Sequence, residues 1–223
     1  MLLVIGNKNY SSWSLRPWLA MKVLGLAFEE QCVALYTPQA KAELLRHSPA
    51  GKAPILIDGA TVVWDSLAIG EYLAERHPAM WPDDRVARAH ARSIVAEMHS
   101  GFAALRSEMS MCIRERVDVR PWSPRLSHDV ERIARIFDES RRRFGQEGDY
   151  LFGRYSIADC FFAPVAFRFQ TYAVALPDPS GEYVRSLLAH SDVRAWERDA
   201  VAETTIIEAD EPRHIYRDKL AKH

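Results

Sequence analysis

Three short segments in the first third of the chain carry residue types that could bind or activate a small polar ligand. The first is Asn9-Tyr10-Ser11-Ser12-Trp13-Ser14-Leu15-Arg16-Pro17, which places three serines directly before a helical pattern. Serine hydroxyls in such a position either cap the helix or donate hydrogen bonds to a reacting group. Capping by Ser12 or Ser14 therefore stays open beside a chemical role, and Pro17 suits the first helical turn.

The second segment, Gly51-Lys52-Ala53-Pro54-Ile55, places a proline directly before an apolar strand pattern. A cis peptide bond at Pro54 would turn the chain sharply and leave the backbone of Ala53 free to pair with an extended ligand. An ordinary trans proline in a turn is the alternative, because most bonds that precede proline are trans.

The third segment, Trp64-Asp65-Ser66, stands at the start of a predicted helix. A helix N-terminus offers free N–H groups to a carboxylate, and the Asp65 side chain could hold an ammonium group. Asp65 and Ser66 together could therefore bind the zwitterionic head of an amino acid. Simple capping of the helix is the alternative interpretation.

These segments lie at junctions in a regular order of strands and helices. Short apolar runs predict strands, and apolar spacings of three and four predict helices. The strands are expected at 2–5, 30–35, 54–57 and 61–64, and the helices at 14–25, 40–47 and 66–76. Asp58-Gly59 joins the last two strands as a hairpin. The order β-α-β-α-β-β-α predicts a mixed four-stranded sheet with helices on its faces.

The remainder of the chain shows helical patterns only. Residues 77–84 contain His77-Pro78 and Trp81-Pro82 and are predicted to form a linker. Helices are expected at 85–116, at 127–144, from about residue 156, and once or twice within 180–200, with an irregular polar tail from Glu208. The spacing of Ser156 and Asp159 predicts a capping box at one helix start. The second domain is therefore expected to be all-helical.

Composition excludes several classes of protein. The 223 residues are 48% hydrophobic and 26% charged, as in folded proteins, with a net charge of -1 that argues against nucleic acid as a partner. No apolar run is long enough to cross a membrane. Cys32, Cys112 and Cys160 are widely spaced, so no metal site is predicted, and a cytoplasmic location is expected.

The serine-containing turn, the Ala-Pro before the third strand and the Asp-Ser before the third helix together resemble the glutathione S-transferase superfamily. The resemblance covers nearly the whole chain, and Ser156-Ile157-Ala158-Asp159 is also similar to the family's later helical domain. The opening is most similar to the zeta type, Ser-Ser-Cys-x-Trp-Arg, and departs from it at Trp13 and Leu15.

The resemblance implies two domains and a shared ligand. Residues 1–77 would form a thioredoxin-like domain that binds glutathione as co-substrate, 78–84 a linker, and 85–223 an all-helical domain that lines the electrophile site. It also implies a homodimer, in which the small domain of one subunit contacts the helical domain of the other.

The resemblance assigns the thiol of glutathione to the first serines. Ser12 would donate a hydrogen bond to the thiolate without attacking the substrate itself, and Ser11 is the alternative donor. The backbone of Ala53, before Pro54, would pair with the cysteinyl part of glutathione. Arg16 is expected to support the first helix.

The two ends of glutathione would meet charged groups. Asp65 and Ser66 would hold the γ-glutamyl end, and Lys52 would lie near the glycyl carboxylate, with His47 as a weaker candidate. The electrophile pocket is expected between the domains, with these candidate walls: Trp13, Met98, Phe102, Met109 and Trp122. A role in the helical core is the alternative for the Met and aromatic residues of this set.

The expected function is a glutathione transferase that conjugates or isomerises a small electrophile, with a maleylacetoacetate isomerase-like reaction as one form. A glutathione-dependent peroxidase and a non-catalytic glutathione-binding interaction protein are the alternatives. A thiol–disulfide reductase is disfavoured, because no cysteine occurs between residues 9 and 31 to supply a protein thiolate.

Overall fold

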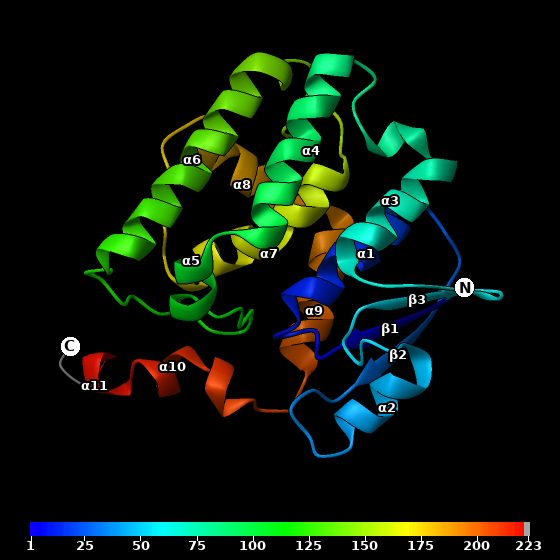
Figure 1. The fold of residues 1–223 in the computed structure, drawn as a ribbon. Helices are drawn as coiled ribbons and strands as arrows, with labels where there is room; N and C mark the ends of the chain where they lie inside the picture. The colour runs from blue at the N-terminus through cyan, green and yellow to red at the C-terminus, as the bar shows by residue number, and fades with distance from the viewer. Residues whose placement is uncertain (221–223) are drawn as a thin grey trace.

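The computed structural model describes residues 1–220, in which a four-stranded mixed sheet lies beside a larger group of helices (Figure 1). The strands are β1 (Leu2–Gly6), β2 (Glu29–Val33), β3 (Ile55–Asp58) and β4 (Thr61–Val63), in the spatial order β2-β1-β3-β4. Strand β1 is parallel to β2 and antiparallel to β3, which forms a hairpin with β4. The predicted fold class, a thioredoxin-like sheet domain followed by helices, is confirmed.

Alternation along β1 separates the two faces of this sheet. Leu3 and Ile5 are buried in the core shared with α1 (Ser12–Val23) and α3 (Ser66–Arg76). Val4 points to the other face, where it packs with apolar residues of α2 (Ala40–His47). Because β1 and β3 are antiparallel, the end of β1 lies beside the start of β3. The turn that leads into α1 and the loop that leads into β3 are therefore at the same edge of the sheet.

The helical lobe is built around one buried helix. Its elements are a 3-10 turn (Pro78–Met80), α4 (Arg85–Ser100), α5 (Ala103–Glu108), α6 (Pro124–Phe144), α7 (Ile157–Thr171), α8 (Ser180–Ala189) and α9 (Ser191–Ala202). Almost every residue of α7 is buried, because it packs against both α1 and α4. One apolar cluster consequently extends from β1 and α1 through α7 to α9.

The prediction of one helix over 85–116 is wrong. Helix α4 ends at Ser100, and Phe102 takes a left-handed backbone conformation with φ of 59° before α5 begins. The Arg106 guanidinium donates to the carbonyls of Met98 and Gly101 at this end. The apolar pattern continues through the break, since Leu105 still reaches the core, and periodicity alone cannot locate such an end.

Two other helices begin earlier than predicted. Helix α1 starts at Ser12 and α6 at Pro124, with Ser123 as the capping residue of α6. Proline fits the first position of a helix because the N–H it lacks would have no partner there. Pro124, which lies before the predicted start at residue 127, is therefore the first residue of α6.

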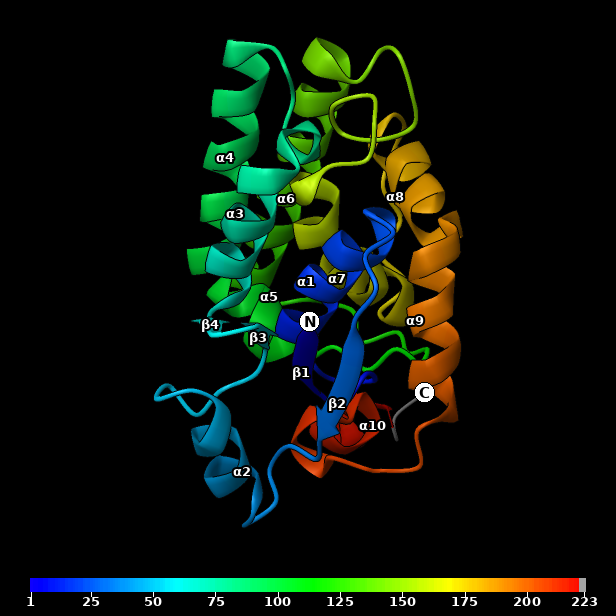
Figure 2. The same cartoon turned by 90° about the vertical axis from the view of Figure 1, so that its right-hand side faces the viewer.

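The tail predicted to be irregular from Glu208 forms short helical turns instead, at Glu208–Asp210, α10 (Pro212–Ile215) and α11 (Arg217–Leu220). In Figure 1, α10 and α11 run beneath α5, on the side of the molecule away from the N-terminus, and Figure 2 shows the tail below α9. Positions 221–223 of the predicted helical domain lie outside the described residues. Within residues 1–220, no helix combines the length and apolar character needed to span a membrane.

The tail is fixed to the N-terminal turn by side-chain contacts. The Tyr10 hydroxyl donates to the Glu211 carboxylate and accepts a hydrogen bond from Arg114, and it accepts another from the Ile207 N–H at 3.2 Å. The Glu203 carboxylate accepts from the backbone N–H groups that follow β1, at residues 8 and 9. The turn that begins α1 is thus held by residues near the end of the chain.

Candidate functional site

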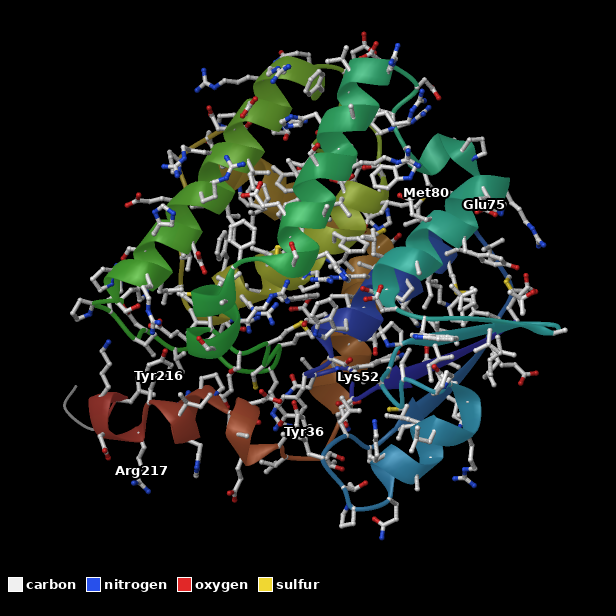
Figure 3. All side chains as sticks on the ribbon, in the orientation of Figure 1. Tyr36, Lys52, Glu75, Met80, Tyr216 and Arg217 are labelled. Atoms are coloured by element: carbon white, nitrogen blue, oxygen red, sulfur yellow. The ribbon has the colours of Figure 1, made fainter. Side chains whose placement is uncertain are left out.

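A pocket of about 350 Å³ opens where the three segments identified in the sequence meet. It is lined by Trp13, Ala50, Lys52, Ala53, Pro54, Trp64 and Asp65. The first turn of α1, the loop between α2 and β3, and the segment directly before α3 each contribute to this wall. The pocket is large enough for a small ligand. Lys52 lies near the middle of Figure 3, below α1.

The loop before β3 carries three of the predicted binding residues. Lys52 is exposed, Ala53 is half-buried and Pro54 is buried, and the Ala53–Pro54 peptide bond is cis. Asp65 lies across the pocket from this loop, in the turn between β4 and α3. His47, at the end of α2, is half-buried and does not line the pocket.

Asp65 is the capping residue of α3, as one of the two interpretations of the sequence expected. Its Oδ1 atom accepts from the backbone N–H groups of Leu67 at 3.0 Å and Ala68 at 3.5 Å. Ser66 is fully buried, and its hydroxyl is 3.5 Å from the Arg16 guanidinium. Arg16, expected to support its own helix, therefore reaches the start of α3.

Ser11, not Ser12 or Ser14, caps α1. The Ser11 hydroxyl accepts from the Ser14 N–H and donates to the Ser14 hydroxyl at 2.7 Å, which in turn accepts from the Gly6 N–H at 3.0 Å. The proton and an acceptor position of Ser11 are both used in this local network. Its arrangement is that of a structural serine.

Ser12 has a different environment, at the first position of α1. Its hydroxyl oxygen accepts from Nη2 of Arg168 at 3.4 Å, and within residues 1–220 its proton is not used in a hydrogen bond. Burial lowers the pKa of Arg168 to about 10, so the guanidinium stays charged at neutral pH. Ser11 and Ser12 are only 6% and 5% exposed, and neither lines the pocket.

Trp13, unlike the two serines before it, lines the pocket. The guanidinium groups of Arg16 and Arg106 lie 4.3 and 4.8 Å from the centre of its indole ring, which makes a T-shaped contact with the His99 ring, with centroids 5.2 Å apart. Cations over an aromatic face are attracted by its negative quadrupole. These contacts fix the ring at the boundary between the lobes.

The Arg16 guanidinium is buried, and no carboxylate of residues 1–220 is in contact with it. Its Nε and Nη2 atoms have no hydrogen-bond partner among residues 1–220, and its guanidinium packs on the Phe161 ring at 4.7 Å. Burial, and the nearby charges of Arg106 and Arg168, lower the pKa of Arg16. Three cationic side chains therefore gather behind Trp13 and Ser12.

Most of the residues expected to line an electrophile pocket lie in the core. Met98, Phe102 and Met109 are buried in the apolar cluster, while Trp122 is half-buried against it. Trp13 is the member of that set that lines the pocket. Met98, Phe102 and Met109 are thus part of the core, which was the alternative interpretation of the Met and aromatic pattern.

Sequence reasoning did not single out His99, Arg106 or Arg168. They come from α4, α5 and α7, and nothing in their spacing indicates that they meet behind the first turn. Within the described part of the chain, no three His, Cys, Asp or Glu side chains gather as a metal site would require.

Two family models match the chain. The N-terminal domain of glutathione S-transferase matches residues 10–76, and the C-terminal domain of the same family matches residues 115–199. Together they include all the residues of the pocket and most of the helical lobe.

Curated relatives include members of the zeta class. A probable maleylacetoacetate isomerase from Caenorhabditis elegans is 39% identical over 45% of this chain and 47% of its own length. A zeta class glutathione S-transferase from Euphorbia esula is 41% identical over 30% of this chain and 31% of its own length. The chain thus aligns with less than half of either protein. A stringent starvation protein A homolog from Pasteurella multocida is 26% identical over 87% of this chain and 85% of its own.

Solved structures show the same fold over nearly the whole chain. A glutathione transferase homolog from Burkholderia GL BGR1, with bound glutathione, is 25% identical with a TM-score of 0.66, over 91% of this chain and 98% of that one. Maleyl pyruvate isomerase, a bacterial glutathione S-transferase in the zeta class, is 22% identical with a TM-score of 0.68, over 92% of this chain and 100% of that one. The chain therefore belongs to the glutathione S-transferase superfamily, as a zeta-like member of this enzyme family.

Proposed function

We propose that the chain binds glutathione in the pocket between Trp13, Lys52 and Asp65, stabilises its thiolate with Ser12, and conjugates or isomerises a small electrophile. The observation that carries this proposal is the convergence of three separate segments on one pocket, with a cation on one wall and a carboxylate on another. A tripeptide with a carboxylate at one end and an amino-acid head at the other matches that distribution of charge.

The polar groups of the pocket match the parts of glutathione. The Lys52 ammonium attracts the glycyl carboxylate, and the Ala53 backbone pairs with the cysteinyl residue as a short strand would. Asp65 binds the γ-glutamyl ammonium group. The free N–H groups at the start of α3, with Ser66, bind the γ-glutamyl carboxylate.

The thiol is ionised by its surroundings. A free cysteine thiol has a pKa near 8.5, and hydrogen bonding to the thiolate and nearby positive charge both lower that pKa. Because Arg168 donates to the Ser12 oxygen, the Ser12 proton can be donated to sulfur. The Arg168 charge and the N-terminus of α1 add to this stabilisation.

The ionised sulfur then attacks an electrophilic carbon. In conjugation a C–S bond forms while a leaving group departs or a proton is taken up at the neighbouring carbon. In isomerisation the sulfur adds to a C=C bond, the resulting C–C single bond rotates, and the sulfur is expelled again. The second course returns glutathione unchanged, so it acts there as a cofactor.

The test is the pKa of bound glutathione, measured by the ultraviolet absorbance of the thiolate against pH, in the wild type and in Ser12→Ala. We expect the substitution to raise that pKa by about one to two pH units. We also expect it to lower kcat/KM for a reactive electrophile by about 10²–10³-fold, as for loss of one donor to a developing anion. Equal thiol pKa values in the two proteins would overturn the role of Ser12.

Glutathione binding without catalysis is the second candidate, because both serines are buried and lie outside the pocket wall. It predicts retention on immobilised glutathione but no turnover of halogenated aromatics, enones, peroxides or a maleyl diketoacid. Turnover of any of these with glutathione, and not without it, excludes this candidate.

We also propose that the protein acts as a cytoplasmic homodimer, in which the sheet domain of one subunit faces the helices of the other. The superfamily membership supports this arrangement. Sedimentation equilibrium of the purified protein tests it, and a monomer at micromolar concentration contradicts it.

A further inference from the structure

The pocket wall contacts the helical lobe through a carboxylate–imidazole pair. Oδ2 of Asp65 lies 3.1 Å from Nε2 of His99, which stands in the last turn of α4. Asp65 belongs to the sheet domain and lines the pocket, whereas His99 belongs to the helical lobe and does not. The contact therefore links a pocket residue to an element remote in the sequence.

Both oxygens of the Asp65 carboxylate are held, each by a different part of the molecule. Oδ1 accepts from the N–H groups at the start of α3, and Oδ2 faces His99. The Asp65 side chain is still 52% exposed, so a ligand can reach it. Without His99, rotation of the carboxylate would be limited by the α3 cap alone.

His99 is well suited to hold a carboxylate without cancelling its charge. Its ring makes a T-shaped contact with that of Trp13 and lies 6.3 Å from that of Phe161, and Nδ1 has no partner among residues 1–220. Burial, with the positive charges of Arg16 and Arg106, lowers the pKa of His99, while Asp65 opposes this effect. The neutral ring donates through Nε2–H, so Asp65 keeps its negative charge for a ligand.

We propose that His99 is a positioning residue, which orients Asp65 toward the ammonium group of the amino-acid head of the ligand. The inference rests on the proposed function, since it takes the γ-glutamyl end of glutathione as that head. It makes the affinity for a free amino group depend on the helical lobe, through α4. His99 itself does not touch the ligand.

Calorimetric titration with two ligands tests this inference. One ligand is glutathione, and the other is glutaryl-cysteinyl-glycine, which lacks only the γ-glutamyl amino group. We expect His99→Ala to weaken glutathione binding about tenfold, the effect of losing one hydrogen bond to a charged group. Binding of the analogue should change less than about twofold. His99→Gln, whose amide can still donate, should restore most of the affinity for glutathione.

The exposed His214 in α10 provides the matched control, and His214→Ala should bind both ligands as the wild type does. Equal weakening of both ligands in His99→Ala would show a general structural role and overturn the proposal, as would no weakening of either. A wild type that binds neither ligand would overturn the proposed function, and this inference with it. If His99→Ala fails to fold, His99→Gln and Asp65→Asn are compared with the wild type instead. The proposal is supported if His99→Gln still binds glutathione more tightly than the analogue and Asp65→Asn does not.

Discussion

Ser11 and Ser12 are adjacent in the sequence but use their hydroxyl groups differently. The Ser11 hydroxyl closes a network with Ser14, and the Ser12 hydroxyl accepts from Arg168 and retains its proton. The sequence alone could not separate them, because both stand at the same junction between strand and helix. The distinction comes from Arg168, which lies 156 positions later than Ser12.

We expect Ser11→Ala to affect stability more than chemistry. Loss of a helix-capping serine costs about 1 kcal/mol in the free energy of unfolding. Urea denaturation should show that loss, while the pKa of bound glutathione stays at its wild-type value. A raised thiol pKa in Ser11→Ala, equal to that in Ser12→Ala, would mean that the two hydroxyls share one role.

The candidate site was predictable where its residues belong to local motifs. Lys52, Ala53, Pro54 and Asp65 were expected from short segments, and the fold brings them to one pocket. His99 was not, because its place in the last turn of α4 does not indicate which residue of the sheet domain it faces.

At the scale of elements, the end of α4 is stabilised by a side chain from the next helix. Arg106 donates to the carbonyls of Met98, His99 and Gly101, which have no partners further along α4. A cation also interacts favourably with the negative end of the helix dipole. The break between α4 and α5, which the apolar pattern did not indicate, is thus stabilised by the Arg106 guanidinium.

We expect Arg106→Gln to lower the free energy of unfolding by about 1.5–3 kcal/mol, because hydrogen bonds from a charged donor to a helix end are lost. Arg194, exposed on α9, provides the control, and Arg194→Gln should change stability by less than about 0.5 kcal/mol. Chemical denaturation of the three proteins measures both values. Equal stability of both variants would contradict the role assigned to Arg106.

Helix α7 begins with the capping box that its sequence predicted. The Asp159 carboxylate is fully buried and accepts from the backbone N–H and hydroxyl of Ser156, at 2.8 and 2.9 Å, and from the Leu151 N–H. Burial raises the pKa of Asp159 from its ordinary 3.8 to about 6, against the lowering effect of these hydrogen bonds. The desolvation cost therefore exceeds the gain from the donors.

This raised pKa gives stability a defined pH dependence. Because protonation of Asp159 favours the folded state, its contribution is present below about pH 4 and is lost as the pH rises to about 6. The difference in unfolding free energy between wild type and Asp159→Asn should fall by about 3 kcal/mol across that window. Urea titrations at several pH values measure it, and a pH-independent difference would contradict the assignment.

At the scale of the whole molecule, the two lobes share one core. The apolar cluster contains Leu3 and Trp18 from the sheet domain and Phe161 and Trp196 from the helices. Lys8 adds a polar connection, with its ammonium group 2.7 Å from Glu30 and 2.6 Å from Asp199. The sequence predicts two domains, at 1–77 and 85–223. The apolar cores of these two parts are continuous with each other.

We therefore expect the two lobes to unfold together. Far-ultraviolet circular dichroism reports mainly on the helices. Tryptophan fluorescence reports on all six tryptophans, which include Trp18 and Trp196, whose ring centroids are 5.1 Å apart at the boundary. Denaturation curves from the two probes should coincide, as in a two-state transition. Separate midpoints would show that the lobes are independently stable.

The contact between the beginning and the end of the chain has a consequence for biosynthesis. Glu203 and Glu211 hold the turn that carries Tyr10 and the serines, yet they are synthesised 194 to 201 positions after the residues that they contact. The nascent polypeptide can form its sheet early, but that turn lacks these contacts until Glu211 has left the ribosome. A premature stop codon near position 200 would thus leave a product whose earliest-made part is unfinished.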